Sequence, residues 1–367
     1  MRIKKAGFIV IAIMVFALSW VGCAQTTPSP TPSPAPAPST PTEEAIKMAI
    51  LTFGERTDGS WAQGHYDAYL YLKDKYPEVD LTFRDAFPFG DFPAIVELYG
   101  EEGMDLVVLD SGSAWGEALR SVAPRYPDTW FIVVATPPES LFTMPDNVVA
   151  YNRQEWEGCF LAGVAAGMRT ETNKVGFVGG MPYAAVIELA AALELGAKWI
   201  NPQVEYHAIY TGDWVDVEAG YESARALIDS GVDVILQHAD NAGLGVIQAC
   251  QEAGVWVIGE TRDQSDLAPD NIITSHLTSF GLCAESALFN YKAGLIRHGV
   301  NIVAIQQGWD PLHPLTNVPA GTAEMVEKVR EAMEVGTIVI PGILDAEALG
   351  TLSPSDYGIP SRAELGY

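Results

Sequence analysis

Short apolar runs alternate with longer amphipathic stretches from residue 45 onward. The short runs are rich in valine and isoleucine, as buried strands are. They predict strands at 47–53, 79–83, 105–110, 130–136, 147–152, 174–180, 204–210, 232–238, 255–260 and 271–277. The stretches between them predict helices at 64–75, 92–101, 113–123, 158–170, 183–199, 217–230, 245–253 and 283–298. Strand–helix alternation of this kind predicts an α/β fold, with parallel sheets covered by helices on both faces.

Polar clusters follow several of the predicted strands. The segment ILQHADNAGLG begins as a buried strand and then places Gln237, His238 and Asp240 close together. Comparable polar stretches, TFGERTDGSW, LDSGSAW, GGMPYA and GETRDQSD, follow other strands. Ligands of open parallel sheets bind beyond the carboxyl ends of the strands. The sequence therefore predicts a shared cleft lined by these segments.

The N-terminus has the pattern of an export signal. A short basic region, MRIKK, precedes an apolar run that is shorter than the roughly 20 residues needed to span a bilayer. The signal is predicted over residues 1–23, and its end, WVGC, resembles a bacterial lipobox in which Cys23 becomes the lipidated first residue. The tryptophan departs from that pattern. Residues 24–43 are rich in Pro, Ser, Thr and Ala, and they predict an extended tether with a reach of up to roughly 50 Å.

Length, charge and cysteine content narrow the class of protein. The remaining chain of about 325 residues suits two lobes better than one core. Beyond the signal, 18 basic residues stand against 47 acidic ones, a net charge near −29, which argues against nucleic acid as a partner. Cys159, Cys250 and Cys283 form an odd set without close spacing, so we expect buried apolar cysteines rather than a disulfide framework or a zinc site. No metal site is predicted.

A long segment resembles a known family signature. NRQEWEGCFLAGVAAGMRTETNKVGFVGGMP, at 152–182, is similar to the signature of the basic membrane protein family of ABC-transporter substrate-binding lipoproteins, which includes the purine nucleoside receptors. ALIDSGVDVILQHADNAGLG, IGETRDQSDLAPDNIITS and VGTIVIP follow in the order expected for that family. The likeness covers nearly all of the chain after the tether.

The resemblance implies a type I periplasmic-binding-protein-like fold, in which two Rossmann-like lobes enclose the ligand. One lobe is predicted at 44–150 plus about 272–305, and the other at 151–271 plus about 306–367. The resemblance also implies an ABC permease as the partner, no cofactor, and a location at the outer face of the cell membrane through the lipid anchor.

Differences from the nucleoside-binding branch bear on the ligand. That branch carries a Phe-Asn pair after the first strand, an Asp where this chain has Thr261, and a Lys near Thr278. The acidic and basic positions hold sugar hydroxyls there, so their absence here argues against ribose recognition. GSWAQGHY, YTGDWVD and LQHADNAG instead resemble a branch that binds free purine bases such as adenine. A base offers two π faces for aromatic rings and a rim of hydrogen-bonding groups, but no hydroxyls.

Several residues are candidates for contact with the ligand, each with an alternative structural role. Trp61 follows a turn at the cleft and is predicted to stack on the ligand, although it could instead pack between elements. Trp214 lies in a loop, and stacking and packing are equally open for it. His238 could be a ligand contact or a satisfied buried imidazole. Asp240 could contact ligand, cap the helix that follows, or do both. At least one of Gln237, His238 and Asp240 is predicted to line the pocket.

Other candidates come from the segment that crosses between the lobes and from a later strand end. Asn152 opens the crossing segment and is predicted near the ligand. Arg153 could touch ligand or pair with an acid across the hinge. Glu260 and Thr261 occupy the position of ribose contact in the nucleoside branch, where they could bind ligand or face solvent.

The predicted function is a tethered receptor that captures a purine base, adenine-like, and presents it to a permease. Alternatives are a purine nucleoside, another small heterocycle, or a sensor without transport. An enzyme using His238 with Asp240 or Asp263 is disfavoured, because the sequence has no nucleophile elbow, no zinc-protease motif and no phosphate-binding Gly-Lys loop. No catalytic residue is predicted.

Overall fold

A computed structural model describes residues 45–134, 143–278, 280–343 and 345–367. The predicted signal at 1–23, its lipidation site Cys23 and the tether at 24–43 lie outside these residues. Within the described part of the chain, no helix combines the length and the apolar character needed to cross a membrane.

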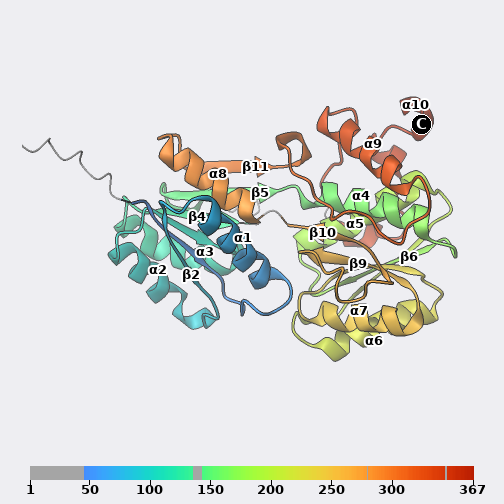
Figure 1. Ribbon diagram of the computed structural model, residues 1–367, viewed down its shortest axis with the longest axis horizontal. Helices are drawn as coiled ribbons and strands as arrows, with labels where there is room; N and C mark the ends of the chain where they lie inside the picture. The colour runs from blue at the N-terminus through green and yellow to red at the C-terminus, as the bar shows by residue number, and fades with distance from the viewer. Residues whose placement is uncertain (1–44, 135–142, 279, 344) are drawn as a thin grey trace, which may run out of the picture. The chain divides into compact units, whose positions relative to one another are not determined.

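The first lobe is a six-stranded parallel sheet in the order β11-β5-β4-β3-β1-β2. Its strands are β1 (Lys47–Leu51), β2 (Asp80–Arg84), β3 (Leu106–Leu109), β4 (Trp130–Val134), β5 (Val148–Arg153) and β11 (Gly299–Val303). Its helices are α1 (Trp61–Lys75), α2 (Phe92–Glu101), α3 (Gly112–Val122) and α8 (Phe280–Lys292). Figure 1 shows α8 and β11, late in the chain, lying with these early elements.

Alternation along the strands decides which face each helix covers, because successive side chains point to opposite faces. In β1, Met48 and Ile50 pack with α1 and α8, whereas Ala49 and Leu51 pack with α2 and α3. Both faces of the sheet are therefore buried, which explains the continuous apolar runs in the sequence.

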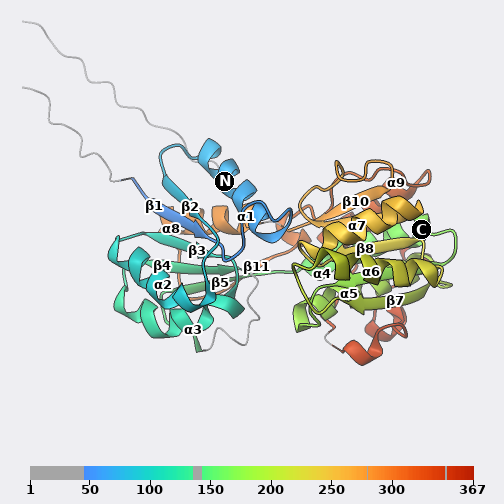
Figure 2. The ribbon, with the colours of Figure 1, turned by 90° about the horizontal axis from the view of Figure 1, so that it is seen from below.

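The second lobe is a five-stranded parallel sheet in the order β10-β9-β8-β6-β7. Its strands are β6 (Lys174–Gly179), β7 (Glu205–Tyr210), β8 (Val234–His238), β9 (Trp256–Thr261) and β10 (Ile272–Leu277). Its helices include α4 (Glu155–Arg169), α5 (Ala184–Ile200), α6 (Val217–Asp229), α7 (Ala242–Ala253) and α9 (Thr322–Glu334), with a short α10 (Arg362–Leu365) near the C-terminus. Helices α4 and α5 pack together on one face, and α6 and α7 on the other; Figure 2 shows α6 and α7 in front of the sheet.

The chain crosses between the lobes after β5, after β10 and after β11. Two of the predicted boundaries are therefore shifted. The strand β5 continues in the first sheet to Arg153, beyond the predicted limit at 150. The strand β10 pairs with β9 and belongs to the second sheet, although the boundary at about 272 assigned it to the first. The sequence of a buried strand does not reveal which sheet it joins.

The ten predicted strands and eight predicted helices are confirmed, with shifts at their ends. The strand β11 and the helix α9 were not predicted. The edge strand β11 is mostly half-buried and has a weak apolar pattern. The helix α9 does carry a helical pattern, since its buried Val326, Val329 and Met333 are three or four residues apart. Cys159, Cys250 and Cys283 are free and buried, which confirms their predicted role as apolar packing residues.

Candidate functional site

Three strand ends supply the candidate site. The loop after β1 leads to Ser60 and Trp61 at the start of α1, β8 ends at His238, and β9 ends at Glu260 and Thr261. The carboxyl ends of parallel strands lie at one edge of each sheet, so each lobe presents its polar loops together. Hydrogen bonds join the loop of the first lobe to those of the second, although 180 to 200 residues separate them in sequence.

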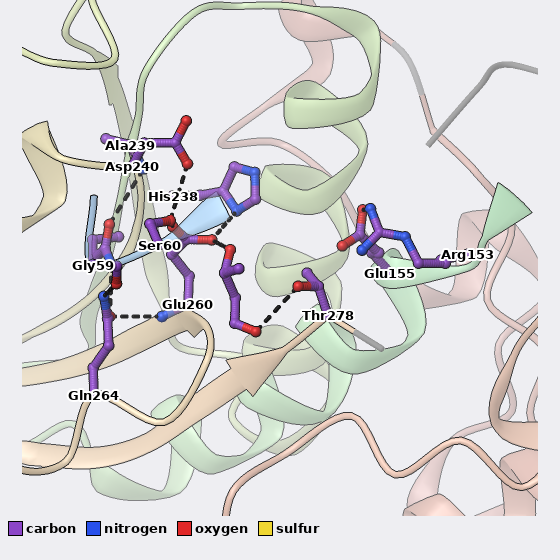
Figure 3. Close-up of polar contacts among 12 residues, drawn as sticks. Gly59, Ser60, Arg153, Glu155, His238, Ala239, Asp240, Glu260, Gln264 and Thr278 are labelled. Carbon is purple, nitrogen blue, oxygen red and sulfur yellow. Dashed lines mark hydrogen bonds and ion pairs between the residues drawn. The ribbon is translucent and has the colours of Figure 1, made fainter. Parts of the chain in front are cut away.

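Ser60 is the centre of a polar network between the lobes. Its hydroxyl Oγ lies 3.0 Å from Asp240 Oδ1 and also contacts Glu260 Oε1. The Thr261 hydroxyl donates to the other Glu260 oxygen, and His238 Nδ1 lies 3.3 Å from that same oxygen. Figure 3 shows Ser60 between the two carboxylates. Ser60 and Glu260 are completely buried and Asp240 is half-buried, so the centre of this network is shielded from solvent.

The titration of these groups follows from their burial. Desolvation raises the pKa of Glu260 to about 7, against the lowering effect of the Ser60 and Thr261 hydrogen bonds. Desolvation also raises the pKa of Asp240, and the nearby carboxylates Glu260 and Asp58 raise it further. Desolvation lowers the pKa of His238 to about 4. His238 is therefore neutral at physiological pH.

Asp240 does not cap the helix that follows it. The N-cap residue of α7 is Asn241, which makes no side-chain capping bond. Asp240 has a left-handed backbone, with φ of 48°, and its carboxylate accepts from Ser60 of the other lobe. The strained backbone directs the side chain across the lobe interface.

Gln237 supports the network, and both polar atoms of its side-chain amide bond to protein groups. Its side-chain Nε2 donates to Gln264 Oε1 at 2.9 Å, and its Oε1 accepts from the Ala239 backbone N at 3.2 Å. Gln264 in turn donates to the Gly59 carbonyl of the first lobe. A Cβ on Gly243 would lie 1.8 Å from Gln237 Oε1. Only glycine therefore fits at position 243, where the first turn of α7 packs against the Gln237 amide.

Trp61 lies beside this network in an aromatic cluster. Its ring meets Phe280 edge-on, with 4.8 Å between centroids. Phe280 stacks on His65, and the Arg153 guanidinium lies 5.2 Å from the Trp61 ring and 4.5 Å from the Phe280 ring. The buried Trp61 Nε1 has no hydrogen-bond partner in the described chain. Trp61 is thus placed at the lobe interface with its polar atom unsatisfied.

Arg153 pairs with an acid at the crossing between the lobes. Its Nη2 lies 3.1 Å from Glu155 Oε2, and the two side chains are 0% and 12% exposed. Figure 3 shows this pair on the side of Thr278, separate from the Ser60 network. Arg153 Nε and Nη1 and Glu155 Oε1 are buried without partners among the described residues. After the ion pair has formed, Arg153 can still donate hydrogen bonds and Glu155 can still accept one.

Trp214 lies beside His238. Its ring is 6.4 Å from the imidazole, at an interplanar angle of 81°. A Cβ on Gly180 would fall 2.3 Å from the Trp214 ring, so the ring packs directly on the backbone after β6. Trp214 is half-buried, which leaves part of its surface accessible.

The remaining predicted residues differ in their relation to the network. Thr261 belongs to it, with a left-handed φ of 67° and a carbonyl that accepts from the Thr278 backbone N and hydroxyl. Asn152 is half-buried on β5, and strand alternation places it on the face opposite Arg153. No described contact brings Asn152 into the network.

Sequence reasoning missed several residues of the site, namely Asp58, Ser60, His65, Glu155 and Phe280. Ser60 follows an Asp-Gly turn at a strand end, a signal that could have marked it. Asp58 accepts from the backbone N–H groups of Ser60, Ala62 and Gln63 and so fixes the start of α1. Phe280 had no comparable signal, because its proximity to Trp61 arises only from the chain's return to the first lobe.

A separate cavity of about 470 Å³ lies beside this region. Residues from both lobes line it, including Gly64, Thr261, Thr278, Gly281 and Trp309. Of the residues that line this cavity, only Thr261 and Thr278 also take part in the hydrogen-bond network of the candidate site. Within the described residues, no group of three or more His, Cys, Asp or Glu side chains is arranged to hold a metal ion.

Comparisons with known proteins identify the family. The family model described as ABC transporter substrate-binding protein PnrA-like matches residues 45–302. A purine-binding protein of Brucella abortus is 25% identical over 303 residues, covering 81% of this chain and 83% of that protein. A Haloferax volcanii protein, named for glucose binding in an ABC transporter, is 28% identical over 236 residues, which span 64% of this chain and 58% of that protein.

A solved structure agrees with this match. The ABC transporter solute-binding protein of Conexibacter woesei superposes with a TM-score of 0.71 at 25% identity, covering 82% of this chain and all of that one. Substrate-binding proteins of ABC transporters take a small-molecule ligand outside the cytoplasm and work with a membrane permease. The chain belongs to the PnrA-like family of ABC transporter substrate-binding proteins, the basic membrane protein family, whose members bind solutes rather than catalyse reactions.

Proposed function

We propose that this protein binds a free purine base, adenine-like, between its lobes and delivers it to an ABC permease. In this proposal Trp61 stacks on the base, and Arg153, Glu155, His238, Asp240 and Glu260 surround its polar rim, with Trp214 beside His238. Gln237 serves as a support, since protein groups already satisfy its amide.

The observation that carries the proposal is the set of buried polar atoms without partners around Trp61. These atoms are Trp61 Nε1, His65 Nε2, Arg153 Nε and Nη1, Glu155 Oε1 and His238 Nδ1. Buried polar atoms are nearly always hydrogen-bonded in proteins. The set includes donors and an acceptor and lies beside aromatic rings, so it suits a flat heterocycle whose rim carries groups of both kinds.

The charge of the site favours a ligand rich in donors. Glu155 and Asp58 add to the carboxylates Asp240 and Glu260, whereas Arg153 is already paired. An anionic ligand would meet like charge at low dielectric. The exocyclic amine of adenine supplies two donors to carboxylate oxygens, and its ring nitrogens accept from Trp61 or Arg153.

The hydroxyls of Thr261 and Thr278 lie at the positions that hold ribose in the nucleoside-binding branch, and their contacts argue against ribose as a ligand. The Thr261 hydroxyl donates to the Glu260 carboxylate, and the Thr278 hydroxyl donates to the Thr261 carbonyl. The structure therefore has neither the charged pair of the nucleoside branch nor free hydroxyls in its place. Because the Haloferax volcanii relative is named for glucose binding, a sugar is the competing ligand class.

Calorimetric titration with adenine, adenosine, hypoxanthine and D-glucose tests the proposal. We expect adenine to bind, with adenosine and glucose weaker by at least about tenfold, a difference of 1.4 kcal/mol. Glucose binding without adenine binding would overturn it. The proposed lipid anchor is tested separately by mass spectrometry of the mature N-terminus, where Cys23→Ser should abolish the lipid adduct and release the protein from membranes.

A further inference from the structure

The contacts of Ser60 place two carboxylates on one hydroxyl. Ser60 Oγ lies 3.0 Å from Asp240 Oδ1 and also contacts Glu260 Oε1. A hydroxyl carries a single hydrogen, and an ionised carboxylate can only accept. Ser60 therefore donates a full hydrogen bond to only one carboxylate, and a carboxyl O–H that donates to Ser60 Oγ satisfies the second contact.

Other donors do not remove this requirement. The Thr261 hydroxyl is directed to Glu260 Oε2, the oxygen that Ser60 does not contact. His238 Nδ1 lies 3.3 Å from that same oxygen without the alignment of a hydrogen bond. Neither group reaches Asp240 Oδ1, so the shortage of one hydrogen stays between Asp240, Ser60 and Glu260.

The charges that face the pair also favour a retained proton. Asp58, from the loop after β1, acts on both carboxylates, and Glu155, at the start of α4, acts on Glu260. Arg153, at the end of β5, is the nearby cation, and it is paired with Glu155 at 3.1 Å. His238 is neutral because burial lowers its pKa to about 4. Two carboxylates that share a site in this way hold one proton between them rather than both ionise.

We propose that the Asp240–Glu260 pair holds one proton whenever Ser60 is seated between the two carboxylates, so that ligand-driven joining of the lobes takes up a proton. The inference rests on the proposed function, since it assigns a proton-linked step to the same ligand site. When Ser60 leaves, water reaches both carboxylates and they ionise in the ordinary acidic range.

The sign of the pH dependence follows from linkage. The joined state has the raised pKa, about 7 for Glu260, and the separated state has a carboxyl pKa near 4. The stabilisation of the joined state is complete below the lower pKa and is lost as pH rises through the higher one. Ligand affinity should thus fall with rising pH, by up to about tenfold per unit between the two pKa values for one linked proton, and should level off above about pH 7.

Adenine titrations of the full chain in two buffers of different ionisation enthalpy test this at about pH 6, between the two pKa values. The wild type should take up about one proton per adenine bound, and uptake should fall towards zero in Glu260→Gln and in Asp240→Asn.

Glu194→Gln is the matched control. Glu194 is a buried carboxylate on α5, bonded to the backbone of Gly350 and Leu352 away from this site, and its variant should keep the uptake. Adenine binding by the wild type without buffer dependence would overturn the inference.

A failure of the proposed function would look different, because adenine would not bind at all. Infrared difference spectroscopy with whichever of adenosine, hypoxanthine and D-glucose binds then decides the inference. Near neutral pH, binding of that ligand should produce the carbonyl band of a protonated carboxylic acid in the wild type, and Asp240→Asn with Glu260→Gln should remove the band while Glu194→Gln keeps it. Ligand binding without the band, or a band that the double variant retains, would overturn the inference.

Discussion

At the scale of single residues, Ser60 shows how a common side chain acquires a specific role. The hydroxyl is completely buried between carboxylates from the other lobe. Its position is fixed by Asp58, which accepts from the Ser60 backbone and from the first turn of α1. The loop after β1 is thus held in the conformation that brings Trp61 and Ser60 to the interface together.

Trp61→Ala should weaken adenine binding by about 1 to 3 kcal/mol, because base–aromatic stacking is lost. Trp61→Phe should retain most of the affinity. Trp256→Ala is the matched control: Trp256 begins β9, at the end of the strand away from Glu260, and stacks with Arg169 at 3.6 Å. Calorimetry should show affinity loss for Trp61→Ala alone. An equal loss in both variants would mean that Trp61 acts through stability rather than contact.

Glu155→Ala should lower the free energy of unfolding by about 3 to 5 kcal/mol, because it leaves the buried Arg153 guanidinium without its anion. Urea denaturation of the ligand-free protein measures this change. The control is Glu171→Ala, which removes an ion pair with Arg169 whose acidic partner is 77% exposed and should cost less than about 1 kcal/mol. Similar costs for the two variants would contradict the buried ion pair.

At the scale of elements, the sequence predicted the architecture well and the site in part. Apolar runs identified the ten strands because both faces of each sheet are buried, and the strand-end rule selected His238, Asp240, Glu260 and Thr261, which the structure gathers into one network. Asn152 was selected from its place on the crossing segment and lies outside that network. A one-dimensional pattern marks strand ends but not the direction of each side chain there.

The start of α7 carries an element-scale prediction. Gly243→Ala should destabilise the protein by about 1 to 3 kcal/mol through overpacking, since the new Cβ would lie 1.8 Å from Gln237 Oε1. Gly281→Ala, in α8, is the matched control, because its Cβ meets neighbours at ordinary distances of 3.7 Å or more. The control should be neutral or stabilising, as alanine is in a helix. Thermal unfolding distinguishes the two, and an unchanged Gly243→Ala would argue against tight packing at this amide.

At the scale of the whole molecule, the candidate site is assembled because the chain returns to the first lobe. Phe280 and Arg153 reach Trp61 only because α8 packs on α1 and the crossing follows β5. These contacts join residues far apart in sequence, so local patterns could not reveal them. The family resemblance predicted the two lobes, whereas only the structure reveals the contacts of Ser60.

A crystal structure of the full chain with adenine tests the central claim most directly. We predict the base against the face of Trp61, with its polar rim within hydrogen-bond distance of Glu260 or Asp240 from one lobe and Arg153 from the other. Adenine seated instead in the cavity lined by Gly64, Gly281 and Trp309, or on the surface of a single lobe, would contradict the proposed site.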